Sequence, residues 1–226
     1  MDKANRKLMQ IENIIFDLDG TLVDSLPGIE YACRCAVDAV CPARGSFKLH
    51  PYIGPPIRDL FRRIFPDIEG NELESLVKEF RKAYDNAGWK KSLLFNGVKT
   101  ALIELENLNI RNYLVTSKPK LPTEKILDFL NVRHCFTEII CPDSMTPNFQ
   151  SKSDAITYLI AKHGLNHEKV LSVGDTILDQ EVATTCGIKF AAADYGYGHF
   201  ENDSVCINFR ISKMPDIVKI IQKGNA

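Results

Sequence analysis

The sequence predicts an α/β fold: a doubly wound, Rossmann-like parallel sheet with an α-helical cap domain inserted into it. Two observations lead to this prediction. Short, continuously apolar runs alternate with helical patterns over the second half of the chain, which is typical of parallel strands buried between two layers of helices. One similar run lies alone near the start, and the long stretch that separates it from the others has helical periodicity only.

The predicted strands are short apolar runs that end at polar or glycine-containing loops. The first is Asn13–Phe16, which ends at Asp17 and is followed by Gly20. The later runs are Tyr113–Val115, Glu138–Ile140, Val170–Val173 and Lys189–Ala192. The helical patterns among them cover residues 98–108, 122–130, 154–161 and 178–186. Residues 1–24 and 95–226 are therefore predicted to form the Rossmann-like core.

Residues 25–94 break this alternation. Apolar side chains recur there every three or four positions, which predicts amphipathic helices and no buried strand. The two clearest stretches contain Ile57, Leu60, Phe61 and Ile64, and then Leu73, Leu76, Val77 and Phe80. We therefore expect residues 25–94 to form a helical cap that leaves the core near Asp24 and returns to it near Phe95.

The composition excludes several classes of partner. The chain has 226 residues, 45% of them hydrophobic and 25% charged, which is ordinary for a globular protein. A formal net charge of -1 gives no positive field to attract nucleic acid or an anionic membrane, so we expect neither as a partner. No signal peptide or membrane-spanning run is visible, and the seven cysteines are scattered without paired zinc-type spacing. These features predict a cytoplasmic protein with reduced thiols and leave monomer and homodimer open.

The residues after the predicted strands carry oxygen ligands. Ligands of open parallel sheets bind beyond the carboxyl ends of the strands, so these residues are expected to meet. They are Asp17, Asp19, Thr116, Ser117, Asp175 and Asp179. Converging carboxylates repel one another unless a cation or proton lies among them, and oxygen ligands suit Mg²⁺. A magnesium site that accepts a phosphate is therefore predicted.

Four motifs resemble the haloacid dehalogenase-like hydrolase superfamily, in its phosphoglycolate phosphatase-like branch with a small helical cap. The first and most specific is the run from Asp17 to Ser25 (DLDGTLVDS). The second is the run from Leu114 to Pro119 (LVTSKP), the third is Lys152, and the fourth is Gly174-Asp175-Thr176 with Asp179. The motifs follow the order of the family and span nearly the whole chain.

The resemblance implies a role for each motif residue. Asp17 is expected to be the nucleophile and a magnesium ligand, with Asp175 as the second side-chain ligand. Asp19 is expected to act as general acid and base and to bind the metal through its main-chain carbonyl. Gly20 allows the loop to approach the phosphate closely.

The remaining motif residues are expected to bind or position the phosphate. Thr116 and Ser117 are expected to donate to its oxygens, although these hydroxyls could instead cap the next helix. Lys152 is expected to balance charge on the phosphate and on Asp17, and Asp179 is expected to orient either metal-bound water or Lys152. Ser153 follows Lys152 where the family commonly has proline, and Lys118 and Lys120 are competing candidates.

In the cap, the segment from Tyr52 to Pro56 resembles the substrate-contacting segment of the family. Gly54 allows a tight bend in it, and Arg58 just beyond is a candidate ligand for a carboxylate or second phosphate on the substrate. The simpler alternative for Arg58 is a solvated basic helix face.

These expectations combine into one function. The chain is predicted to be a magnesium-dependent phosphatase that hydrolyses a small phosphorylated metabolite through an aspartyl-phosphate intermediate. The alternatives are a phosphomutase of the same superfamily, which protects that intermediate from water, and a non-catalytic protein that binds a phosphorylated ligand.

Overall fold

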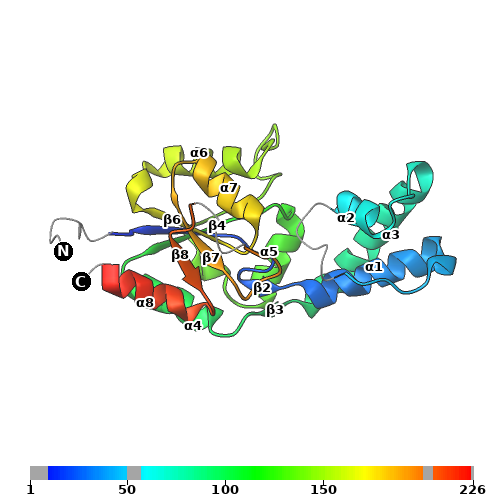
Figure 1. The fold of residues 1–226 in the computed structure, drawn as a ribbon, viewed down its shortest axis with the longest axis horizontal. Coiled ribbons are helices and arrows are strands. Elements are labelled where there is room, and N and C mark those ends of the chain that lie inside the picture. The colour runs from blue at the N-terminus through cyan, green and yellow to red at the C-terminus, as the bar shows by residue number, and fades with distance from the viewer. Residues whose placement is uncertain (1–9, 50–56, 201–205, 225–226) are drawn as a thin grey trace.

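The computed structural model describes residues 10–49, 57–200 and 206–224, which form two lobes (Figure 1). The larger lobe contains a six-stranded sheet in the order β5-β4-β1-β6-β7-β8, and its neighbouring strands are parallel throughout. The strands are β1 (Asn13–Phe16), β4 (Arg111–Val115), β5 (Glu138–Ile140), β6 (Val170–Gly174), β7 (Lys189–Ala193) and β8 (Phe209–Ile211). The predicted parallel α/β sheet is confirmed.

Helices cover both faces of this sheet (Figure 1). They are α4 (Val98–Asn107), α5 (Lys120–Phe129), α6 (Lys152–His163), α7 (Ile177–Thr185) and α8 (Pro215–Gly224). Successive side chains of a strand point to opposite faces, and β1 shows this clearly. Ile14 and Phe16 belong to the hydrophobic cluster that includes α4, α5 and α8, whereas Ile15 belongs to the cluster that includes α6 and α7. Because both faces are covered, most positions of the strands are apolar and buried.

The order of the strands in the sheet determines where the site lies. The chain passes from β1 to β4 and β5 on one side of the sheet, and then crosses to β6, β7 and β8 on the other. Phe16, the last residue of β1, is in register with Leu114 of β4 and Val173 of β6. This reversal opens a crevice at the carboxyl ends of the three strands, where ligands of such sheets bind.

The smaller lobe consists of α1 (Leu26–Val40), α2 (Ile57–Ile64) and α3 (Gly70–Asn86), with short 3₁₀ turns at Pro42–Arg44 and Gly88–Lys91. Its helices have a hydrophobic cluster of their own, to which Val37, Phe61 and Leu76 contribute one side chain from each helix. The lobe therefore has the helical content expected of residues 25–94. The division of the chain into two domains at those positions stays a prediction.

Two short strands connect the lobes. They are β2 (Val23–Asp24) and β3 (Leu93–Leu94), which pair in antiparallel orientation. The hydroxyl of Tyr197, in the loop after β7, accepts hydrogen bonds from the main-chain N–H groups of Ser25 at 2.7 Å and Leu26 at 3.0 Å. The same hydroxyl donates to Asp24 Oδ1 at 2.8 Å. A core loop thus holds the beginning of α1.

Some elements were not predicted from the sequence. They are β2, β3, β8, α8 and the 3₁₀ turns, which besides those above include Arg133–Cys135 and His167–Lys169. The predicted helix at 122–130 begins two residues earlier, at Lys120. Within the described ranges, every helix is too short or too polar to span a bilayer.

Candidate active site

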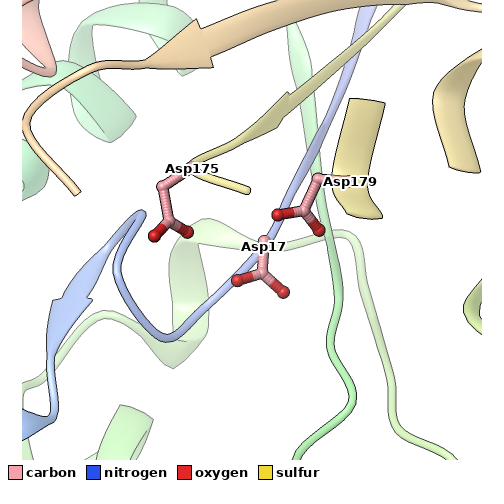
Figure 2. Close-up of side chains that lie close together, drawn as sticks. All are labelled: Asp17, Asp175 and Asp179. Carbon is pink, nitrogen blue, oxygen red and sulfur yellow. The ribbon is translucent and has the colours of Figure 1, made fainter. Parts of the chain in front are cut away.

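Three carboxylates meet at the carboxyl ends of β1 and β6. Asp17 directly follows β1, Asp175 directly follows β6, and Asp179 lies in the first turn of α7. Each offers one oxygen atom, and these atoms all lie within 4.8 Å of one another. Figure 2 shows the three groups gathered around the same small volume. The structure therefore brings together Asp17, Asp175 and Asp179, three of the residues that the sequence predicts to meet at this edge of the sheet.

Lys152 completes this cluster. It is the first residue of α6, and its Nζ donates to Asp17 Oδ1 at 2.5 Å and to Asp179 Oδ1 at 2.6 Å. Burial by itself lowers the pKa of Lys152, but the charges of Asp17 and Asp179 outweigh it, so the pKa lies above its ordinary value. A cation in the first turn of a helix opposes the helix dipole, and these two carboxylates compensate for that.

Burial, helped by neighbouring carboxylates, raises the affinity of the acids in this cluster for protons. Burial raises the pKa of Asp17 from 3.8 to about 8, with Lys152 opposing the shift and Asp179 and Asp175 adding to it. Burial also raises the pKa of Asp175 to about 6, and the charge of Asp179 contributes. Three carboxylates with one lysine leave a net negative site that attracts a cation. Its ligands are oxygen atoms only, which fits Mg²⁺ better than a softer metal.

The carboxylate of Asp175 is enclosed by backbone and hydrogen bonds, and the side chain is fully buried. Thr21 Oγ1 donates to its Oδ1 at 3.0 Å, and the main-chain N–H of Tyr197 donates to its Oδ2 at 2.9 Å. A Cβ atom at Gly20 would lie 2.2 Å from Asp175 Oδ2, and one at Gly196 would lie 2.2 Å from Asp175 Cβ. Gly20 also has a φ of 87°, so both space and backbone conformation require glycine there. In this structure Gly20 therefore packs against a carboxylate.

Asp179 is held by its own helix. Its Oδ2 accepts from the N–H of Thr176 at 3.1 Å and from Thr176 Oγ1 at 2.6 Å, while Thr176 Oγ1 accepts from the N–H of Asp179. This reciprocal capping box fixes the first turn of α7. The other oxygen of Asp179, Oδ1, accepts from Lys152.

Asp19 points to a different partner. Lys118 Nζ donates to Asp19 Oδ2 at 2.8 Å, so the side chain of Asp19 is not part of the three-carboxylate cluster. Asp19 Oδ1 is buried and has no hydrogen-bond partner among the described residues. Lys118 and Lys120 were the competitors of Lys152. The structure pairs Lys118 with Asp19, and Lys120 is exposed and does not line the cavity, so Lys152 is the lysine beside Asp17.

Thr116 and Ser117 both line the cavity above the cluster. Thr116 Oγ1 accepts from the N–H of Lys118 at 3.1 Å, which closes a local turn. The helix α5 begins after Pro119 and receives no side-chain cap, so neither hydroxyl caps it.

A cavity of about 640 Å³ lies between the two lobes, with Asp17, Asp19, Lys152 and Asp179 on its floor. Arg58 is not among the lining residues, because it pairs with Glu74 of α3 on the exposed side of the helices. Arg81 of α3, which the sequence analysis did not single out, lines the cavity. The segment from Tyr52 to Pro56, Gly54 included, lies outside the described residues, so its predicted role stays a prediction. The predicted role of Arg58 in substrate binding stays a prediction as well.

Besides Arg81, sequence reasoning missed three residues around Asp175. Thr21, Gly196 and Tyr197 all contact Asp175, and the Thr21 contact joins positions 154 residues apart. Thr21 lies inside the first motif, which is the only local signal that singles it out.

Known proteins share this architecture. A family model described as haloacid dehalogenase-like hydrolase matches residues 14–193. The phosphoglycolate phosphatase of Vibrio cholerae is 34% identical over 203 residues, covering 86% of this chain and 89% of that protein. The tyrosine-protein kinase PtkA of Mycobacterium tuberculosis is 30% identical over 187 residues, covering 82% of this chain but only 62% of the kinase. The crystal structure of a predicted phosphoglycolate phosphatase from Haemophilus somnus superposes with a TM-score of 0.81 at 25% identity, covering 93% of this chain and 98% of that one.

Proposed function

The chain belongs to the haloacid dehalogenase-like hydrolase family, and we propose that it is a magnesium-dependent phosphatase acting on a small phosphate monoester through an aspartyl-phosphate at Asp17. One observation carries the proposal. Asp17, Asp175 and Asp179 converge within 4.8 Å, and Lys152 bridges Asp17 and Asp179. The name of the Vibrio cholerae relative supports the same reaction class.

The metal would be held by the side chains of Asp17 and Asp175 and by the main-chain carbonyl of Asp19, with Asp179 in support. The donor set fits Mg²⁺ because it consists of oxygen atoms and carries excess negative charge. When bound, Mg²⁺ supplies positive charge that offsets the repulsion between the phosphate and Asp17.

In the first step, a carboxylate oxygen of Asp17 forms a bond to phosphorus while the bond from phosphorus to the ester oxygen breaks. The leaving oxygen takes a proton from Asp19. Lys118 occupies Asp19 Oδ2, so we assign that proton to Oδ1, the buried oxygen with no partner among the described residues. Lys152, Thr116 and Ser117 hold the phosphate oxygens and lower the energy of the transition state.

In the second step, Asp19 takes a proton from water as the water oxygen attacks phosphorus. The bond between phosphorus and Asp17 breaks, and inorganic phosphate and the free Asp17 carboxylate result. Asp19 thus serves as acid and then as base, and the enzyme returns to its starting state.

The helical lobe forms the other wall of this reaction chamber. We propose that residues 25–94 are a cap domain on a core of residues 1–24 and 95–226, and that the cap excludes bulk water and sets substrate choice. We also assign the protein to the cytoplasm, because its seven cysteines are free thiols in the structure.

The test is a steady-state assay of p-nitrophenyl phosphate with Mg²⁺, measuring inorganic phosphate. We expect sustained release over many turnovers, none from Asp17→Asn, and normal release from the matched control Asp38→Asn, which changes an exposed aspartate on α1. Thermal melts check that both variants fold.

Other outcomes would contradict the proposal in defined ways. Phosphoryl transfer between positions of a sugar phosphate without phosphate release indicates a phosphomutase, and binding without either reaction indicates a non-catalytic protein. Incorporation of label from γ-labelled ATP into the protein, without phosphatase activity, indicates a kinase like the one that the Mycobacterium relative is named for.

A further inference from the structure

The cavity wall opposite the carboxylates is largely apolar. All three cap helices contribute to it, with Ile29 from α1, Ile57 and Leu60 from α2, and Phe80 and Tyr84 from α3. The core side adds Pro119, Pro122, Leu178 and Val182. Leu178 is 61% exposed although it borders the site, so an apolar ligand placed there would remove that surface from water.

The charges in the same cavity are already committed. Lys152 is paired with Asp17 and Asp179, and Lys118 is paired with Asp19. The exposed residues Arg81, Asp85 and Glu181 also line the cavity, and together they add a net negative charge. A second anionic group on the substrate would therefore find one described cap cation, Arg81, with Asp85 four residues further along the same helix.

We propose that the physiological substrate is a phosphate monoester of an uncharged alcohol or phenol with an apolar body, and not of a carboxylic acid such as glycolate. The inference rests on the proposed phosphatase function and adds to it the class of the leaving group. The phosphate lies on the polar floor, and the apolar body packs against the cap wall. A volume of about 640 Å³ supports this size, because pockets of about 300–1,000 Å³ enclose drug-sized ligands.

The experiment compares matched substrates in the same magnesium-dependent assay. In a series from methyl to hexyl phosphate, we expect kcat/KM to rise by about three- to fourfold for each methylene until the wall is covered. Phenyl phosphate should exceed 4-carboxyphenyl phosphate and 2-phosphoglycolate by at least about tenfold, since one unfavourable charge placement costs that much. A flat chain-length series, or a preference for 2-phosphoglycolate, would overturn the inference while leaving the phosphatase function intact. Absence of turnover with every ester would instead overturn the proposed function itself.

Two variants locate the effect. Ile57→Ser in the cap and Leu178→Ser in the core replace partly exposed side chains that line the cavity, so both should fold and both should flatten the chain-length dependence. Ile103→Ser, on the exposed side of α4 and away from the cavity lining, is the matched control and should keep the wild-type dependence. An unchanged dependence in both cavity variants would show that the alkyl chain binds elsewhere and would overturn the inference.

Discussion

The two walls of the active-site cavity are built by opposite means. On the core side, the carboxylates of the cluster are buried or partly buried and are held by named partners, as Asp175 is by Thr21 and Tyr197. On the cap side, apolar side chains such as Ile57 and Phe80 face the cavity without directional contacts to the carboxylates. The comparison indicates that reaction chemistry is set by rigid geometry in the core, whereas selectivity is set by shape and apolar surface in the cap.

The largest expected effect tests the core wall. Lys152→Met should lower kcat by about 10²- to 10³-fold, as does loss of one preorganised charge or donor in other enzymes. Lys120→Met is the control, because Lys120 is exposed and does not line the cavity, and its kcat should stay within about twofold of wild type, as expected for a surface substitution. A Lys152→Met variant that changes mainly KM would contradict the proposal that the core wall sets the reaction chemistry and the cap wall sets selectivity.

The pH dependence of the free energy of unfolding, measured on the metal-free protein, tests whether the core wall buries charge. Asp17 and Asp175 hold protons more tightly in the folded state, with pKa values of about 8 and about 6 against 3.8 unperturbed. The unfolded chain therefore releases these protons at lower pH, and the free energy of unfolding should fall as pH rises from about 4 to 8, by at most about 1.4 kcal/mol per pH unit for each proton.

Denaturant melts at several pH values, in the presence of a chelator, measure this slope. Asp17→Asn should remove the larger part of this pH dependence. Mg²⁺ should restore stability most strongly near the upper end of the pH range, at about pH 8. A stability that rises with pH over this range would contradict the burial of charge inferred for the core wall.

A matched glycine pair compares the packing of the two lobes. Gly20→Ala places a methyl group against Asp175, so it should reduce kcat at least about tenfold and cost about 1–3 kcal/mol of stability through overpacking. Gly70→Ala in the cap also has positive φ but meets no atom within 4 Å, so it should cost only about 1–2 kcal/mol of backbone strain and leave kcat unchanged. Kinetics and melts on both variants distinguish crowding from strain, and equal kinetic losses would show that crowding is not the cause.

The smallest expected effect concerns the joint between the lobes. Tyr197→Phe removes the hydroxyl that binds Asp24, Ser25 and Leu26, and should cost about 1–2 kcal/mol of stability. Because the hydroxyl holds the start of α1 and does not touch the carboxylate cluster, KM should change more than kcat. A loss confined to kcat would indicate that the joint acts on the core wall.

The core of the fold was predictable from local pattern. Buried strands such as β1 contain an unbroken apolar run, Ile14–Phe16, so the sheet and the polar residues at its carboxyl edge followed from the sequence. β8 was not predictable because it has three residues, one of them the exposed Arg210. The short strands that join the lobes leave a similarly weak signal.

The same distinction holds for the site: residues in motifs were predictable, whereas residues defined by contacts between distant parts of the chain were not. Asp17, Lys152 and Asp175 lie in motifs, and the structure brings them to one place. The roles of Tyr197 and Gly196 depend on contacts with Asp175 across about twenty residues of chain, which no periodicity encodes. In the cap, Arg58 and Arg81 look equally available in the sequence, and only packing shows that Glu74 holds the first while the second reaches the cavity.

The close packing around Asp175 has a consequence for how this protein can change. Gly20 and Gly196 leave no space for even a methyl group beside that carboxylate, so amino-acid replacement at either position damages the site instead of remodelling it. A laboratory-evolution library aimed at new substrates should therefore keep glycine at both positions. Such a library should instead vary positions such as Ile57 and Leu178, where new side chains can be accommodated and the catalytic residues remain unchanged.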